Sequence, residues 1–200
     1  ALVTAQRTAL NFLQLLSGTA TTVNTYVQAI AGTKTHVVDS RKTIPGLRLA
    51  QKYAVRVGGG ANHRVGLYDG ILIKENHIAT AGGVTAALKD AYAIVAAPDV
   101  AARPEAPFIQ IEVERLDQLT EALQAGAKMV LLDNMTHEQI AEAVRINRDQ
   151  FNGQAVLEVS GNVSLDNIRS YAELGVDRIS SGSLTKHIRA TDYSMRVNAV

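Results

Sequence analysis

Short apolar runs alternate with amphipathic stretches along most of this 200-residue chain. Runs rich in β-branched residues predict six strands. They are Thr35–Val38, Gly70–Ile73, Phe108–Val113, Met129–Leu132, Ala155–Val159 and Arg178–Ser180. Apolar residues at helical spacing predict helices between them, at Leu47–Arg56, Val84–Ala97, Leu116–Ala125, His137–Asn147 and Leu165–Leu174. Repeated strand–helix units of this length indicate a parallel α/β fold.

The segment before the first strand predicts helix. Apolar residues recur at helical spacing over Thr4–Ile30, and Ser17-Gly18 predicts a break into two helical segments. No low-complexity linker interrupts the rest of the chain. We therefore expect a single domain over residues 1–200, with leading helices in residues 1–34.

Polar residues follow each predicted strand. Parallel sheets and barrels carry their chemistry just beyond the carboxyl ends of the strands, so these residues are expected to meet at one end of the domain. They include Asp39-Ser40-Arg41-Lys42, Lys74-Glu75-Asn76-His77, Glu112, Asp133-Asn134, Ser160-Gly161-Asn162 and Ser181-Gly182-Ser183. A single charged loop is more often solvated than functional, but six in succession favour a site.

Cations dominate the first part of this predicted site. Arg41, Lys42, His63, Arg64 and Lys74 converge if their strands share a sheet, and Arg and Lys suit carboxylate and phosphate groups. Ion pairing with nearby acids is the alternative for some of them, and the acids concerned are Asp39, Asp69 and Glu75. The concentration of positive charge favours a small polyanion as ligand.

The later strands lead into small-residue turns and carboxylates. Ser160–Asn162 and Ser181–Ser183 each follow a strand and precede a helical segment, where backbone N–H groups can approach a phosphate. Glu112 and Asp133 are acids in a basic site, and either ion pairs or binding of ribose hydroxyls and magnesium would account for them.

Composition narrows the function classes. Apolar residues make up 46% and charged residues 20% of the chain, which suits a soluble domain with a sizeable core. The formal net charge of +1 gives no reason to expect nucleic acid or a membrane as partner. The chain has no cysteine, which excludes disulfides and thiolate nucleophiles and fits a reducing compartment. We expect a cytoplasmic protein.

The motifs that carry these residues resemble those of the quinolinate phosphoribosyltransferase family. They are Asp39–Arg48 (DSRKTIPGLR), Gly59–Arg64 (GGANHR), Leu72–His77 (LIKENH), Leu131–Asn134 (LLDN), Glu158–Asn162 (EVSGN) and Leu184–His187 (LTKH). The resemblance runs from about Thr4 to Arg196 with the motifs in order. Two departures are Ser40, where Thr is usual, and Gln110, which replaces an acid two residues before Glu112.

The resemblance implies an incomplete, TIM-like parallel α/β barrel of six to seven strands. It also implies a homodimer and magnesium-dependent transfer from phosphoribosyl pyrophosphate to quinolinate in NAD biosynthesis, with decarboxylation. A sandwich domain precedes the barrel in this family, and we expect this chain to lack it.

The resemblance also implies residue roles. Arg41, Arg64 and Lys74 would hold quinolinate with His63 beside them, and Arg7 would enter from the other subunit. Lys42 and Lys74 would face the pyrophosphate. Glu112 and Asp133 would hold the ribose hydroxyls directly or through magnesium, so Lys74, Glu112 and Asp133 are the candidate catalytic residues. Ser40 belongs to the first motif, and Ser160, Gly161, Asn162, Ser181, Gly182 and Ser183 would hold the 5′-phosphate.

Two other functions remain open from the sequence. The first is a nicotinate phosphoribosyltransferase of the same architecture. Nicotinate carries only one carboxylate, so it would not need all the cationic groups of His63, Arg64 and Lys74. The second is a non-catalytic relative that binds a metabolite. Release of carbon dioxide from quinolinate distinguishes a quinolinate phosphoribosyltransferase from both of these alternatives.

Overall fold

Six strands form one parallel sheet in the computed structural model, which describes residues 2–196. They are β1 (His36–Val38), β2 (Gly70–Ile73), β3 (Phe108–Val113), β4 (Met129–Asp133), β5 (Val156–Ser160) and β6 (Arg178–Ser180). The strand order is β1-β6-β5-β4-β3-β2. Because β1 pairs with β6, the strands follow one another around an arc that is broken between β1 and β2. This arrangement confirms the predicted incomplete parallel α/β barrel.

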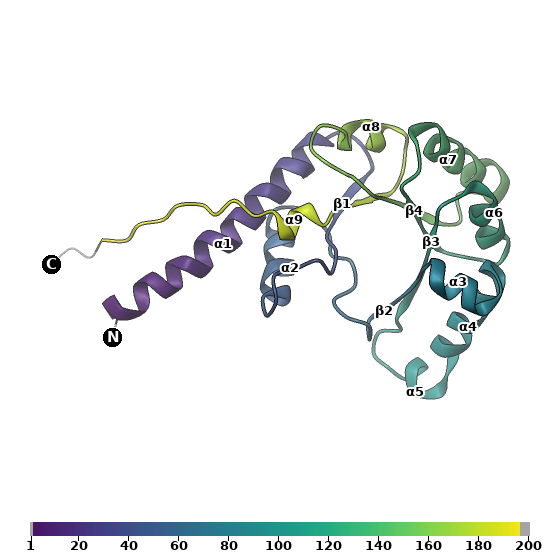
Figure 1. Cartoon of the computed structure of the whole chain (residues 1–200), viewed down its shortest axis with the longest axis horizontal. Coiled ribbons are helices and arrows are strands. Elements are labelled where there is room, and N and C mark those ends of the chain that lie inside the picture. The colour runs from purple at the N-terminus through teal and green to yellow at the C-terminus, as the bar shows by residue number, and fades with distance from the viewer. Residues whose placement is uncertain (1, 197–200) are drawn as a thin grey trace.

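Helices cover the outer side of the sheet (Figure 1). The chain forms α1 (Leu2–Ala29), α2 (Arg48–Val57), α3 (Glu75–Ala81), α4 (Val84–Ala96), α5 (Pro98–Ala101), α6 (Leu116–Gln124), α7 (His137–Phe151), α8 (Ile168–Glu173) and α9 (Ser183–Lys186). Helices α4, α6 and α7 lie side by side around the outside of the arc. Each of these helices follows a strand and returns the chain to the start of the next, as parallel pairing requires.

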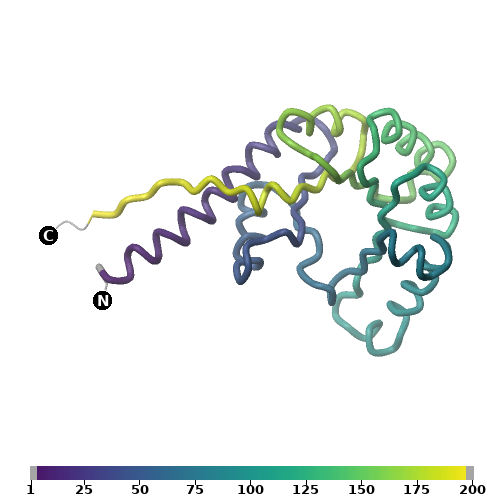
Figure 2. Tube along the Cα trace, viewed as in Figure 1, coloured from purple at the N-terminus to yellow at the C-terminus, as the bar shows by residue number. Residues whose placement is uncertain are grey.

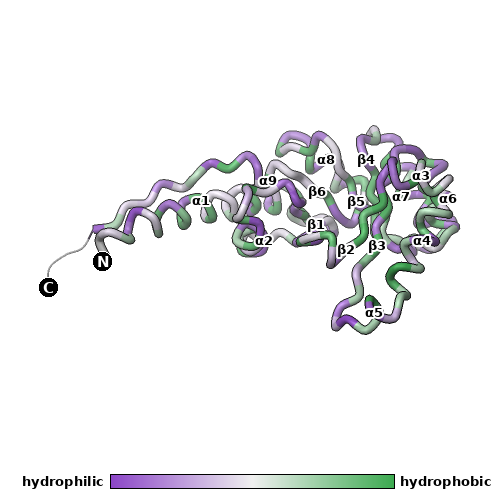
Figure 3. Tube along the Cα trace, turned by 60° about the horizontal axis from the view of Figure 1, so that its bottom comes forward, coloured by the Kyte–Doolittle hydropathy of each residue, from purple (hydrophilic) through white to green (hydrophobic). Residues whose placement is uncertain are grey.

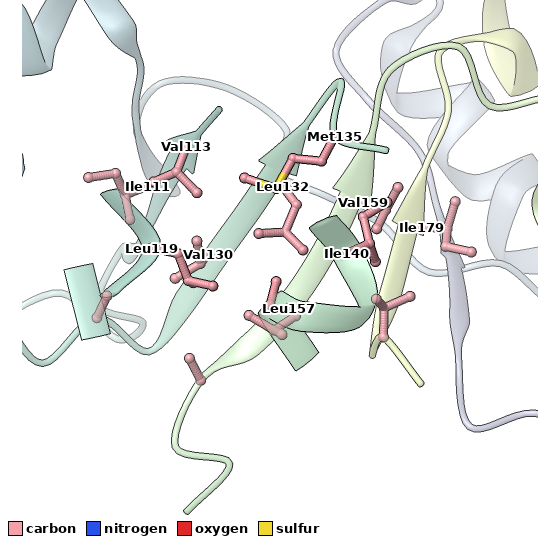
Figure 4. Close-up of a cluster of buried hydrophobic side chains, with 14 of the residues drawn as sticks. Ile111, Val113, Leu119, Val130, Leu132, Met135, Ile140, Leu157, Val159 and Ile179 are labelled. Carbon is pink, nitrogen blue, oxygen red and sulfur yellow. The ribbon is translucent and has the colours of Figure 1, made fainter. Parts of the chain in front are cut away.

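The hydrophobic core lies between the strands and these helices. Side chains alternate along a strand, so Ile111 and Val113 of β3 share the outer face with Val130 and Leu132 of β4, and all four are buried. Figure 4 shows Leu119 of α6 packed in the same cluster. The central strands are coloured as strongly hydrophobic in Figure 3. Burial of each such side chain stabilises the fold by about 1.5–3 kcal/mol.

The inner face of the sheet is polar at its centre. Gln110, Glu158 and Arg178 alternate with the outward-facing core residues of β3, β5 and β6. Gln110 and Glu158 are fully buried, and Arg178 pairs with Glu158 across neighbouring strands. Barrel interiors are usually filled by branched apolar side chains. Here hydrogen-bonded polar side chains share the inner face with Leu72 and Leu131.

The segment from Gly60 to Arg64 bridges the break between β1 and β2. Its Ala61 N–H donates to the Val37 carbonyl at 2.8 Å, and the Ala61 carbonyl accepts the Asp39 N–H at 3.1 Å. This pairing is an isolated parallel bridge to Val38. On the other side, Arg64 Nη1 donates to the Gly70 carbonyl of β2 at 2.9 Å. One bridge therefore stands where a further strand would complete the barrel.

A buried ion pair fixes this bridging segment. Asp39, immediately after β1, is fully buried, and its Oδ1 accepts from Lys52 Nζ of α2 at 2.6 Å and from the His63 N–H at 2.8 Å. Its Oδ2 accepts from Asn62 Nδ2 at 2.7 Å. Burial raises the pKa of Asp39, and Lys52 opposes that rise. The partners of Asp39 thus stabilise its ionised carboxylate in the buried position.

The predicted break in the leading helix is wrong. Helix α1 runs without interruption from Leu2 to Ala29. Gly18 serves close packing instead, because a Cβ at this position would overlap the Arg189 carbonyl oxygen. The segment after α9 lies along α1 in Figure 2, held by the Gln6 Nε2 to Met195 carbonyl bond at 2.8 Å.

The other predicted elements are found with small shifts at their ends. β2, β3 and β6 have the predicted bounds, whereas β5 begins and ends one residue later than predicted and includes Ser160. The largest helix shift is in α7, which continues to Phe151. Helix α3 was not predicted, because it begins directly after Lys74, where the sequence indicated only the polar end of a strand. The short α5 was not predicted either.

No helix within residues 2–196 combines the length and apolar character needed to span a membrane.

The Lys52→Met variant tests how much the buried Asp39–Lys52 ion pair contributes to stability. Removing Lys52 leaves the Asp39 carboxylate buried without its charged partner, which we expect to lower the free energy of unfolding by about 3–5 kcal/mol. Denaturant titration followed by circular dichroism measures this change. Lys34→Met is the matched control, because the Lys34 side chain is 60% exposed where it pairs with Asp177. Such exposed pairs contribute about 0–1 kcal/mol, so equal losses in the two variants would contradict this account.

Candidate active site

A pocket of about 730 Å³ opens at the carboxyl ends of the strands. It gathers the predicted site residues of the sheet and its loops, namely Ser40, Arg41, Lys42, His63, Arg64, Lys74, Glu112, Asp133, Ser160, Gly161, Asn162, Ser181, Gly182 and Ser183. The strand order places different kinds of side chain at different parts of the pocket rim. Cations lie at the break between β1 and β2, carboxylates follow β3 and β4, and small-residue turns follow β5 and β6.

The cation side of the pocket holds two neighbouring guanidinium groups. Arg64 is 8% exposed, and burial together with the charge of Arg41 lowers its pKa. Within residues 2–196, no carboxylate lies within ion-pairing distance of Arg41, Lys42 or Arg64. Positive charges gathered without a protein counterion favour an anionic ligand.

The predicted ion-pair alternatives take other partners. Asp39 pairs with Lys52 rather than with a pocket cation. Lys74 does form an ion pair, but with Glu112, whose two carboxylate oxygens lie 2.6 and 2.8 Å from Lys74 Nζ. Lys74 is 44% exposed, so the pair faces the pocket opening and can be rearranged by a ligand.

Two neighbouring carboxylates, Glu112 and Asp133, line the next part of the rim. Burial raises the pKa of Glu112, and the charge of Asp133 adds to the rise while Lys74 opposes it. The Asp133 carboxylate accepts from Ser160 Oγ of β5 and from Asn134 Nδ2. These contacts fix two carboxylates side by side, at the place where an electron-poor or hydroxyl-bearing group of a ligand would be stabilised.

The turns after β4 and β5 pack tightly against each other. Gly161 has φ +94°, and a Cβ there would overlap the Asn134 side chain. Asn134 and Asn162 also adopt the left-handed conformation, with φ 52° and φ 47°. At the turn after β6, a Cβ on Gly182 would lie 2.8 Å from Lys42 Cδ. Glycine at these two positions therefore permits close packing against Asn134 and Lys42, and both glycines line the pocket.

The floor of the pocket is a chain of buried hydrogen bonds. His63 Nε2 lies 2.6 Å from Gln110 Oε1, and Gln110 Nε2 donates to Glu158 Oε2 at 3.2 Å. Glu158 in turn pairs with Arg178 at 3.2 Å. Burial lowers the pKa of His63, with the charge of Glu158 opposing.

Several lining residues were not among the predicted site residues. Asp39 was expected at this end of the domain as an ion-pair partner for the pocket cations, and Glu158 was part of a motif without a role of its own. The other lining residues without a predicted role are Arg48, Leu72, Leu131, Asn134, Val163, Ser180 and Lys186. Arg48 braces the first loop, because its Nη2 donates to the Arg41 carbonyl and its Nη1 to the Val65 carbonyl, each at 3.2 Å. Such contacts join residues far apart in sequence and leave no local pattern.

Arg7 is the one predicted site residue that does not line the pocket. It is exposed on the first half of α1, which projects away from the sheet (Figure 1). Its predicted role therefore requires a second copy of the chain.

Asp69 holds the loop that connects the bridging segment to β2. Its two carboxylate oxygens accept the Val65 N–H at 2.7 Å and the Gly66 N–H at 2.8 Å. Burial alone would raise the pKa of Asp69, but these backbone hydrogen bonds outweigh it and lower the pKa. The loop that follows Arg64 is thereby set by an ionised carboxylate.

The description "Quinolinate phosphoribosyl transferase, C-terminal domain" belongs to the family model that matches residues 19–196. The chain is a member of this family. It is 45% identical over 194 residues to the nicotinate-nucleotide pyrophosphorylase [carboxylating] of Mycobacterium leprae, covering 97% of this chain and 65% of that protein. It is 38% identical to the probable enzyme of that name from Bacillus subtilis, covering 98% of this chain and 64% of the relative.

Solved structures of the family have the same fold. The nicotinate-nucleotide pyrophosphorylase from Francisella tularensis has a TM-score of 0.85 and 50% identity, over 94% of this chain and 63% of that one. NadC from Streptococcus pyogenes has a TM-score of 0.88 and 43% identity, over 98% of this chain and 65% of that one. The chain thus spans slightly less than two thirds of the length of the relatives it matches.

Asp69→Asn tests the contribution of the Asp69 carboxylate to stability. A folded-state pKa below the ordinary value means that Asp69 stabilises the fold above the ordinary pKa and loses this effect as pH falls through the folded value. We expect Asp69→Asn to lower the free energy of unfolding by about 1–3 kcal/mol near neutral pH, and the difference to shrink in acid. Thermal unfolding across pH measures it. The exposed Asp90→Asn serves as control, and a deficit that persists unchanged in acid would rule out the electrostatic cause.

Proposed function

We propose that the chain is the catalytic domain of a quinolinate phosphoribosyltransferase. The proposed reaction transfers the phosphoribosyl group of phosphoribosyl pyrophosphate to quinolinate and gives nicotinate mononucleotide, pyrophosphate and carbon dioxide. The observation that carries the proposal is the pair of neighbouring guanidiniums, Arg41 and Arg64, without a carboxylate partner in residues 2–196. Curated relatives at 38% identity bear the name quinolinate phosphoribosyltransferase [decarboxylating].

A pyridine dicarboxylate matches the cation side of the pocket. Two adjacent carboxylates require more than one cation, and Arg41 and Arg64 can each bind one in a planar, bidentate manner. Lys74 lies beside them on the rim and would leave Glu112 in part to reach a substrate. Holding the ring here would direct its nitrogen toward the centre of the pocket.

The carboxylate side of the pocket suits the ribose. During transfer the ring nitrogen of quinolinate forms a bond to the anomeric carbon while the bond from that carbon to pyrophosphate breaks. Positive charge develops on the sugar, and Glu112 and Asp133 would offset it and bind the hydroxyls. Catalysis then consists of positioning and electrostatics, without a covalent enzyme intermediate. The electron pair of the breaking carbon–carbon bond stays on the ring carbon as carbon dioxide leaves, where the adjacent cationic ring nitrogen stabilises it. A proton from solvent then bonds to this carbon in place of the lost carboxylate.

The turns after β5 and β6 suit the phosphate groups. The last strands of a barrel commonly bind phosphate through backbone N–H groups. Gly161 and Gly182 line the pocket at these turns, and Lys42 extends over Gly182. We assign the 5′-phosphate to Ser160–Asn162 and Ser181–Ser183, with Lys42 and Lys74 toward the pyrophosphate.

Magnesium is the proposed cofactor, and the residues present fit it. Residues 2–196 hold no cluster of three or more His, Cys, Asp or Glu that would bind a metal alone. Magnesium is commonly bound by one or two carboxylates plus substrate phosphates, and Glu112 and Asp133 are two carboxylates that line the same pocket. When bound, the ion would neutralise charge on the leaving pyrophosphate.

The proposed reaction is tested with full-length protein, magnesium, phosphoribosyl pyrophosphate and carboxyl-labelled quinolinate. We expect nicotinate mononucleotide and labelled carbon dioxide in equal amounts. Lys74→Ala should lose nearly all turnover, because a charge-assisted bond contributes about 1.5–3 kcal/mol or more. Lys128→Ala removes an exposed lysine at the opposite ends of the strands and should keep full activity. Equal use of nicotinate with no carbon dioxide would assign the chain to the alternative transferase, and no turnover of either would favour a binding protein.

We further propose a homodimer in which Arg7 completes the partner's pocket. Arg7 is exposed and lies outside its own pocket, on a projecting half of α1. In a symmetric dimer each subunit contributes the same residue to the other.

Mixing inactive variants tests this sharing. Arg7→Ala and Lys74→Ala homodimers should each be nearly inactive. After subunit exchange, a mixed dimer carries one site with both substitutions and one with neither, so activity should return to roughly a quarter of the unmodified value. Steady-state assay and native mass spectrometry measure activity and mixed dimers in the same sample. Exchange of Arg7→Ala with itself is the control, and mixed dimers that form but stay inactive would exclude the sharing of Arg7.

A further inference from the structure

The hydrogen bonds of His63 determine which of its ring nitrogens carries a proton. The Arg64 N–H donates to His63 Nδ1 at 2.8 Å, so Nδ1 acts as an acceptor and carries no hydrogen. A neutral imidazole has one donor and one acceptor nitrogen. The proton therefore lies on Nε2, which donates to Gln110 Oε1 at 2.6 Å.

Glu158 determines which groups donate and which accept in the row of hydrogen bonds from His63 through Gln110. An ionised carboxylate only accepts hydrogen bonds, and Arg178 pairs with Glu158 at 3.2 Å. Gln110 must therefore turn its amide NH₂ toward Glu158, which leaves its carbonyl oxygen for His63. Gln110 and Glu158 are fully buried, so water does not compete for these groups.

We propose that Gln110 is a positioning residue that holds His63 in its neutral, Nε2-protonated form, with both ring nitrogens occupied by the protein. His63 then gives a ligand in the pocket neither a positive charge nor an unoccupied ring nitrogen. Recognition of carboxylates falls to Arg41, Arg64 and Lys74, while His63 fixes the backbone of Arg64. The nature of the ligand rests on the proposed function, but the state of His63 does not.

The surroundings of His63 explain why an uncharged partner matters. Glu158 on β5 and Arg178 on β6 face the ring, and Arg64 follows it in the chain. The Phe108 ring of β3 meets the imidazole edge-on, with centroids 5.5 Å apart. Glu158 Oε1 is buried without a hydrogen-bond partner, 3.8 Å from His63 Nε2. Gln110 thus stands between His63 and a carboxylate that would otherwise be its partner.

The side chain of Gln110 can be removed with little change in length by Gln110→Met. His63 Nε2 then loses its acceptor, and Glu158 becomes the nearest one. A carboxylate partner favours the charged imidazolium. An ordinary histidine is roughly three quarters protonated at about pH 6, so this pH separates a neutral from a charged His63.

Nuclear magnetic resonance of ¹³C,¹⁵N-histidine in full-length protein reads the state of the ring directly. We expect His63 to be neutral and Nε2-protonated near pH 6, and to be charged at the same pH in Gln110→Met. The signal is assigned by its loss in His63→Asn. Gln51→Met is the matched control, because Gln51 is another fully buried glutamine whose two side-chain hydrogen bonds go to Ile44 and Thr185 and not to His63.

The unmodified protein alone can overturn the proposal. A charged His63 near pH 6, or a proton on Nδ1, would refute it even if Gln110→Met does not fold. So would an unchanged His63 in a folded Gln110→Met variant, or the same change in Gln51→Met.

Quinolinate binding separates this proposal from the proposed function. Calorimetry should show that Gln110→Met binds quinolinate roughly threefold or more tightly near pH 6 than near pH 8, because a charged donor adds to the site. The unmodified protein should not show this gain. The same pH dependence in both proteins would contradict the role of Gln110, whereas absence of quinolinate binding with the expected resonance signals would remove only the proposed function.

Discussion

The pocket depends on one buried carboxylate, that of Asp39. A charge with no exposed surface is stable only when paired and hydrogen-bonded, and Asp39 obtains its partners from three places: Lys52 of α2, the Asn62 side chain and the His63 N–H. These contacts tie α2 and the bridging segment to the end of β1. The sheet is open at this point, so the ion pair, and not strand pairing, holds these segments together. The Asp39 contacts thereby position Arg41, which follows Asp39 in the chain, and Arg64, which follows His63.

Parallel strand order then distributes the chemistry. Because all six carboxyl ends lie at one edge of the sheet, residues that are scattered along the chain meet there. Going around the rim, the groups that line the pocket change in the order of the loops. Guanidiniums lie at the break, carboxylates follow β3 and β4, and glycine turns follow β5 and β6. A ligand with an anionic ring, a sugar and a phosphate would meet a matching part of the rim at each of its groups. This order supports the proposed transfer reaction better than any single residue does.

The sequence predicts the strands well because most of them are short apolar runs bounded by polar residues. Helices are less certain at their ends. Ser17-Gly18 predicts a break that does not occur, since the reason for Gly18 is the passage of Arg189, which lies far away in sequence. Helix α3 begins at Glu75, and its start is capped when the Lys74 N–H donates to His77 Nδ1. Histidine here takes the place of the Glu or Gln that usually accepts this bond in a capping box, so the local sequence does not predict the start of the helix.

The site shows the same division between local and distant information. The residues that face the pocket follow strands directly, and strand position alone brings Arg41, Lys74 and Glu112 together. The residues beneath them do not follow this rule. Gln110 belongs to the middle of an apolar strand, and its value becomes visible only when Glu158 and His63, both distant in sequence, are seen on either side of it. A polar group inside a barrel must satisfy its hydrogen bonds there, and at Gln110 doing so also sets the charge of the site above it.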